Sequence, residues 1–208
     1  AKEHGLFLIS DEVYREFVYG GEPLASMAQF DDAAENVVVV DSISKRFSAC
    51  GARVGILVSR NRELMAQALK ICQGRLCSAT LDQLGAAALY GVGSDYFSAV
   101  REEYHRRRDT CMEGLSQIPG VVCECPKGAF YLMAKLPVDD TDKFQTWLLE
   151  EFQDNGETVM FAPGEGFYGT PGKGRDEIRR AYILKQEDLR RAMEVLAHGI
   201  EAYNSRKL

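Results

Sequence analysis

The sequence has little of several features that mark whole classes of protein. It contains one tryptophan and three histidines among 208 residues, and it has no apolar run of membrane length. We therefore expect no membrane-spanning segment. The histidines (His4, His105 and His198) lie outside the motifs discussed below, so we assign them no part in catalysis.

An excess of positive charge is also missing. The chain has 25 Lys and Arg residues against 31 Asp and Glu residues, a net charge of −6, which gives no reason to expect nucleic-acid binding. Its six cysteines show no repeated metal-ligand spacing. In the sequence Cys123-Glu124-Cys125 we expect packing rather than metal binding. Reduced thiols of this kind are typical of a cytoplasmic protein.

What the sequence does contain is a series of strand and helix patterns. Continuous apolar runs at residues 6–9 and 37–40 predict strands buried on both faces, as in a parallel sheet. A third strand is expected at 54–58. Helical spacing follows at residues 62–73, 82–90 and, after the N-cap Ser94, to about residue 117.

After residue 120 the pattern changes. Strands are predicted at 121–125 and 129–136, then a helix capped by Thr141 or Asp142. Short strands at 158–162 and 178–184 precede a final amphipathic helix with apolar residues from 189 to 203. We therefore expect an α/β fold in two domains. Residues 1–95 form part of a large domain with a mostly parallel sheet, and residues 96–208 a small α/β domain with the linking helix.

The most informative stretch follows the second predicted strand. Residues 42–55 read SISKRFSACGARVG, so Lys45 is flanked by Ser42 and Ser44, and Arg53 stands among small residues. A lysine on a packed turn loses its proton more readily than a surface lysine and can form a Schiff base with a carbonyl. Hydroxyl and guanidinium donors suit a phosphate. Pyridoxal 5'-phosphate (PLP) is an aldehyde that carries a phosphate.

Residues 42–55 resemble the PLP-lysine signature of class I/II aminotransferases, which are fold-type-I PLP enzymes. Every position agrees with the family pattern. The resemblance implies that Lys45 forms the Schiff base with PLP and that Ser42 and Arg53 bind its phosphate. Ser44 is counted with them among the cofactor-binding residues.

A second motif closes the first predicted strand. The resemblance assigns Asp11 to the pyridine nitrogen of PLP and Tyr14 to its phenolic oxygen. A carboxylate keeps the ring nitrogen protonated, and a cationic ring withdraws electrons from the substrate. Taken alone, an aspartate with a tyrosine three residues later also suits a helix cap or an exposed turn.

A third motif lies near the carboxyl end, where residues 178–182 read IRRAY. The resemblance implies an arginine that binds the substrate α-carboxylate, and Arg179 stands at the matching position. Alternation along a strand sends Arg179 and Arg180 to opposite faces, and we expect Arg180 to be a surface charge. Many relatives have an apolar residue where Arg180 stands. Residues 128–131 and 162–167 also resemble stretches of the family.

The resemblance implies transamination from an amino acid, with aspartate as the first choice, to a 2-oxo acid in a homodimer. It covers only the later half of a family member, so we expect a fragment that is inactive and binds PLP weakly by itself. Two alternatives stay open. One is a C–S lyase or aminocyclopropane-carboxylate synthase-like enzyme, because these share the motifs. The other is the sensor domain of a PLP-dependent transcription regulator.

Overall fold

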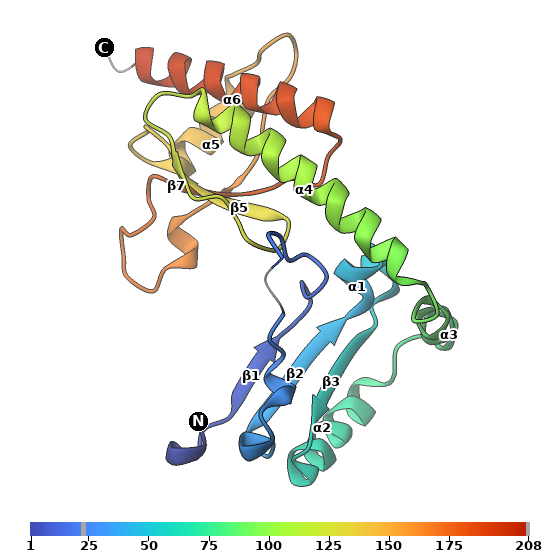
Figure 1. Cartoon of the computed structure of the whole chain (residues 1–208). Helices are drawn as coiled ribbons and strands as arrows, with labels where there is room; N and C mark the ends of the chain where they lie inside the picture. The colour runs from blue at the N-terminus through green and yellow to red at the C-terminus, as the bar shows by residue number, and fades with distance from the viewer. Residues whose placement is uncertain (22–23, 207–208) are drawn as a thin grey trace. The chain divides into compact units, whose positions relative to one another are not determined.

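The computed structural model describes residues 1–21 and 24–206, and the chain divides into two compact units, residues 1–99 and 100–208 (Figure 1). Helix α4 (Ser94–Ser116) runs through the boundary between them. No helix within the described ranges is long and apolar enough to cross a bilayer.

The first unit contains a three-stranded sheet in the order β1-β2-β3 (Figure 1). β1 (Leu8–Asp11) and β2 (Val37–Ser42) are parallel, whereas β3 (Gly55–Ser59) is antiparallel to β2. The chain returns from β2 to β3 through residues 43–54, and β3 begins opposite Ser42.

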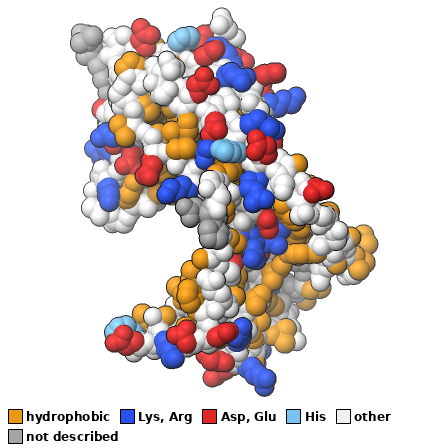
Figure 2. Space-filling model, in the orientation of Figure 1, with side chains coloured by type: hydrophobic (Ala, Val, Ile, Leu, Met, Phe, Trp, Pro, Cys, Tyr) orange, Lys and Arg blue, Asp and Glu red, His pale blue; other side chains and the backbone are white. Residues whose placement is uncertain are grey.

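β1 corrects one of the sequence predictions. Val37, Val38 and Val39 of β2 are buried as expected, but Leu8 and Ile9 of β1 are 40% and 68% exposed. β1 is an edge strand, so it lacks a neighbour on one side and the described residues do not cover its faces. Figure 2 shows hydrophobic side chains at the surface of this unit.

Helices connect and follow these strands. α1 (Ile43–Arg46) is a single turn, and α2 (Arg62–Arg75) and α3 (Thr80–Leu89) lie close to the predicted ranges. Ile43 and Phe47 form a small core with Ala86 of α3. Short 3-10 helices complete the unit: η1 (Lys2–His4), η2 (Met27–Gln29), η3 (Asp31–Ala33) and η4 (Cys50–Ala52).

The second unit contains a four-stranded antiparallel sheet in the order β4-β5-β7-β6. Its strands are β4 (Val122–Cys123), β5 (Tyr131–Lys135), β6 (Ala162–Pro163) and β7 (Glu177–Ala181). Its further helices are α5 (Thr141–Glu150), η5 (Glu165–Phe167) and α6 (Gln186–Ser205). The predicted apolar stripe of the last helix is confirmed: its members, Leu189, Met193, Leu196, Ile200 and Tyr203, are all buried in the core.

Three local predictions in this unit are wrong. The N-cap of α5 is Asp140, whose carboxylate accepts a bond from the Lys143 N–H, because the Thr141 hydroxyl donates to backbone carbonyls instead. The strand expected at 158–162 is found only at β6, which pairs with two residues of β7. β4 ends at Cys123, so Cys125 lies outside it and is exposed.

Candidate active site

The carboxyl ends of β1 and β2 lie side by side in the first unit. Asp11, the last residue of β1, is opposite Val40, and β2 continues to Ser42. Ser42 is in turn opposite Gly55 at the start of β3. Because neighbouring strands are about 4.8 Å apart, these ends and the turn before Gly55 meet at one edge of the sheet.

Lys45 lies on the one-turn helix that begins where β2 ends. The backbone of Ser42 is extended, with φ −157°, and its hydroxyl oxygen accepts a hydrogen bond from the Ser44 N–H at 2.9 Å. This bond is an N-cap, and it starts α1. Lys45 is half-buried on that turn. The Ser42 hydroxyl still has its own proton to donate, so capping is compatible with binding a phosphate oxygen.

Arg53 follows η4 with its backbone in the left-handed region, at φ 57°. Its Nη1 donates to the Cys50 carbonyl oxygen at 2.9 Å, and its own carbonyl oxygen accepts from the Ser78 hydroxyl at 3.2 Å. The first bond restrains the exposed side chain of Arg53, and the second holds its backbone. A guanidinium has five N–H donors, so the bond to Cys50 leaves capacity for an anion.

Asp11 and Tyr14 occupy the turn after β1. The Asp11 Oδ1 accepts a hydrogen bond from the Val13 N–H at 3.2 Å, which is a local turn contact, and the side chain is exposed. Tyr14 is half-buried, and its ring meets Phe17 edge-on at 6.3 Å between centroids. The carboxylate of Asp11 has further acceptor sites for a protonated ring nitrogen.

The donors at this edge have the chemistry that PLP needs. An amine for the aldehyde, hydroxyl and guanidinium groups for the phosphate and a carboxylate for the ring nitrogen all come from the first unit. The structure therefore brings together the strand ends and turns that carry the predicted residues Asp11, Ser42, Ser44, Lys45 and Arg53. Their individual roles stay predictions.

A pair of charged side chains next to Lys45 was missed by the sequence analysis. Arg46 is 8% exposed, and its Nη2 lies 2.5 Å from Oδ2 of Asp41. The available signal was an acid directly after a buried apolar strand and a second base beside the lysine. In sequence, each looks like an ordinary surface charge.

Arg179, the predicted substrate residue, lies on β7 in the second unit. Arg179 is exposed and Arg180 is buried, so the expected alternation is confirmed. The Arg179 guanidinium lies 4.4 Å from the ring centroid of Phe167 and 5.4 Å from that of Tyr131. Contact with two aromatic rings restricts the orientation of the guanidinium while its donors stay accessible to a carboxylate.

Arg180 is not the surface charge that we expected. It is 6% exposed, because alternation turns it to the buried face of β7 with Ile178 and Tyr182. Its Nε and Nη1 have no hydrogen-bond partner among the described residues. Burial lowers the pKa of the Arg180 guanidinium and raises the pKa of the neighbouring Cys111 thiol to about 11.

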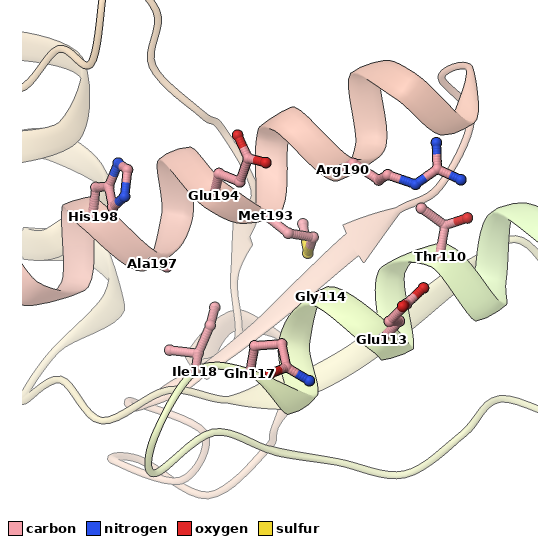
Figure 3. Close-up of a pocket in the computed structure, with 10 residues that line it drawn as sticks. All are labelled: Thr110, Glu113, Gly114, Gln117, Ile118, Arg190, Met193, Glu194, Ala197 and His198. Carbon is pink, nitrogen blue, oxygen red and sulfur yellow. The ribbon is translucent and has the colours of Figure 1, made fainter.

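A pocket of about 330 Å³ lies between α4 and α6 in the second unit (Figure 3). Its lining combines apolar residues, such as Ile118 and Met193, with charged ones, such as Glu113 and Arg190. None of the predicted site residues lines this pocket. In the described part of the chain, no group of His, Cys, Asp and Glu residues is arranged to hold a metal ion.

Known proteins resemble the chain in sequence over almost all of its length. It is 30% identical to the aspartate aminotransferase of Bacillus subtilis strain 168, over 97% of this chain and 51% of the relative. It is also 30% identical to the aspartate aminotransferase of Musicola paradisiaca strain Ech703, over 99% of this chain and 50% of the relative. The chain therefore spans about half the length of the curated relatives that it matches.

Solved structures of aminotransferases also resemble the chain over almost all of its length. The α-aminoadipate aminotransferase LysN of Thermus thermophilus, complexed with N-(5'-phosphopyridoxyl)-L-leucine, superposes with a TM-score of 0.84 at 25% identity, over 98% of this chain and 52% of that chain. The aromatic aminotransferase of Pyrococcus horikoshii gives a TM-score of 0.82 at 28% identity, over 99% of this chain and 53% of that chain.

These likenesses confirm the expected α/β fold class, as part of the fold that PLP-dependent aminotransferases share. The family model described as "Aminotransferase class I and II" matches residues 1–196, nearly the whole chain. The chain therefore belongs to the class I and II aminotransferase family.

Proposed function

We propose that this chain supplies the C-terminal half of a PLP-dependent aminotransferase, which transfers an amino group from an amino acid to a 2-oxo acid. One observation carries the proposal. The strand ends and turns that bear Asp11, Lys45 and Arg53 meet at one edge of the sheet, in a chain that belongs to this family. The first unit is assigned to the cofactor and the second to the substrate.

In this proposal Lys45 has two tasks. Its amine would hold the cofactor through the aldehyde carbon, and as a free amine it would move the proton of the substrate α-carbon. PLP, when bound, acts as the electron sink that stabilises negative charge at that carbon. Asp11 would keep the ring nitrogen cationic, and Tyr14 would donate a hydrogen bond to the ring oxygen. Ser42, Ser44 and Arg53 bind the phosphate.

Arg179 is assigned to the α-carboxylate of the substrate, since a planar guanidinium binds a carboxylate through two parallel hydrogen bonds.

Aspartate is the first choice of amino donor, and its support is the set of aspartate aminotransferases among the relatives. We further propose a cytoplasmic homodimer. Six cysteines without a disulfide are in keeping with a reducing compartment.

The test replaces the lysine in the full-length protein that contains this chain. Lys45→Ala is expected to abolish turnover and the visible absorption band of lysine-linked PLP, because the proposal assigns both the covalent link and the base to Lys45. The matched control is Lys70→Ala, which changes an exposed lysine of α2 whose Nζ donates to the Gln67 side chain at 3.1 Å. Turnover retained by Lys45→Ala would remove Lys45 from this role.

A product assay separates transamination from the alternative reactions. The full-length protein is mixed with each candidate amino acid and 2-oxoglutarate. Transamination yields the oxo acid of the donor together with glutamate, whereas a lyase acting on a sulfur amino acid yields pyruvate and ammonia. Binding of PLP and amino acids without any product would favour the sensor alternative.

A further inference from the structure

A cluster of ionisable side chains surrounds the base of α1 in the first unit. It joins the turn after β1 to the end of β2 and to α1 itself. The cluster consists of Glu12, Arg15, Glu16, Asp41 and Arg46. The proposed function uses none of these residues.

Arg46 is buried beside two acidic members of the cluster. Its Nη2 lies 2.5 Å from Oδ2 of Asp41, and its Nε lies 3.6 Å from Oε1 of Glu16. The guanidinium also lies over the ring of Tyr90, 5.7 Å from the centroid. The side chains of Arg46 and Asp41 are each only 9% exposed, so water does little to weaken their attraction.

The Arg46–Asp41 ion pair joins the two ends of the turn that carries Lys45. Asp41 directly precedes the N-cap Ser42, and its Oδ1 also accepts the Ser42 N–H at 2.7 Å. Arg46 directly follows Lys45. A one-turn helix is not stable by itself, because helix nucleation fixes several dihedral angles for very few hydrogen bonds. The direction of α1, and with it the point from which the Lys45 side chain starts, therefore depends on tertiary contacts such as this ion pair.

The same cluster links α1 to the turn that follows Asp11. Nη1 of Arg15 lies 3.8 Å from Oδ2 of Asp41 and 4.0 Å from Oε2 of Glu12. Glu12 is itself held, since its Oε1 accepts from the Ser26 hydroxyl at 2.9 Å and from the Met27 N–H at 3.0 Å. The charges therefore connect the chain segments that carry the proposed ring-nitrogen partner and the proposed nucleophile.

We propose that Arg46 is a positioning residue for Lys45: held between Asp41 and Glu16, it fixes the orientation of α1 and so the direction from which the Lys45 amine approaches its reaction partner. The inference rests on the proposed function of Lys45. Arg46 touches no reacting atom. Its role depends on the planar guanidinium, which presents Nη2 to Asp41 and Nε to Glu16 in a fixed geometry that the ammonium of a lysine does not have.

The experiment compares Arg46→Lys with Arg60→Lys in the full-length protein loaded with PLP. Both substitutions keep the charge and remove the guanidinium. Arg60 is a matched control because it also pairs with an aspartate, Asp31, but both side chains are largely exposed. The readouts are kcat and KM, the PLP content, and hydrogen exchange of the segment 43–48 in the protein freed of PLP.

For Arg46→Lys we expect kcat to fall by about ten- to a hundredfold, because a small misplacement of a reacting group has an effect of that size. KM and PLP content should stay close to the wild-type values, because no residue that binds substrate or cofactor has changed. Exchange of the segment 43–48 should become faster. Arg60→Lys should match the wild type in every readout.

A folded Arg46→Lys protein with wild-type kcat and wild-type exchange overturns the proposal. If Arg46→Lys does not fold, Glu16→Gln makes the same test at the more exposed partner, with a smaller loss of kcat expected at unchanged KM and an unchanged kcat overturning the proposal. Lys45→Ala with full turnover would instead remove the proposed function. That outcome is distinct, because it does not depend on any Arg46 variant.

Discussion

Arg179 and Arg180 are neighbours in sequence with opposite surroundings. Arg179 is exposed between aromatic rings, whereas Arg180 is buried with two of its nitrogens unpaired among the described residues. Strand alternation predicts that one arginine faces inward, but sequence alone does not reveal that the inward position belongs to a packed core. The error about Arg180 arose because an arginine is expected at the surface, and its burial depends on the helices packed against that face of the sheet.

This difference predicts opposite responses to one substitution. Arg180→Met should keep or raise the free energy of unfolding, by up to about 3 kcal/mol, because a buried charge without full pairing is replaced by an apolar side chain of similar length. Arg179→Met should change that free energy by less than about 1 kcal/mol, since only ring contacts are lost. Urea unfolding of both variants measures the values.

The same two variants differ in their expected kinetics in the full-length protein. Arg179→Met should raise KM for the amino acid strongly, because the carboxylate loses its bidentate partner. Arg180→Met should leave KM unchanged. A large loss of stability in Arg180→Met would show that the buried guanidinium has an energetic partner, and an unchanged KM in Arg179→Met would remove Arg179 from the substrate site.

At the scale of elements, long amphipathic helices were predicted best. The ranges of α2, α4 and α6 were close to those expected, because their apolar spacing extends over several turns. α1 was missed, since a single turn has no periodicity and depends on the Ser42 cap and on buried charges. The strand expected at 158–162 was overestimated, since only Ala162 of that range pairs with β7.

The close approach of α4 and α6 supplies a prediction at this scale. Gly114 of α4 faces Met193 of α6 (Figure 3), and a Cβ added at Gly114 would lie 2.5 Å from the Met193 Cγ. Gly114→Ala should therefore lower the free energy of unfolding by about 1–3 kcal/mol through overpacking.

The matched control for this substitution is Gly85→Ala in α3, where an added Cβ meets nothing within 4 Å. Alanine there should stabilise the chain by about 0.5–1 kcal/mol, because glycine loses more backbone entropy in a helix. The two variants should thus shift the urea midpoint in opposite directions. Equal shifts would contradict the close packing of Gly114 against Met193.

At the scale of the whole molecule, the two units differ in how completely they are covered. The second unit has an extensive core built on α4, α5, α6 and its sheet. The first unit leaves apolar side chains of β1, α2 and α3 exposed, such as Ile9, Ile71 and Leu81. A sequence predicts which runs are apolar, but burial depends on what packs against them. Coverage of about half of each relative agrees with a first unit that needs further chain to cover it.

This incomplete coverage predicts weak cofactor binding by the chain alone. Titration of the isolated chain with PLP should give only a weak absorbance change, because Asp11 and Arg53 of the proposed site are exposed to water, which weakens their attraction to a charged ligand. The same titration on the full-length protein should show an affinity at least about a hundredfold higher, which corresponds to about 2.7 kcal/mol. Fluorescence of a dye that binds exposed apolar surface should be lower for the full-length protein than for the isolated chain. Tight, saturable binding of PLP by the isolated chain would mean that residues 1–99 already hold a complete cofactor site.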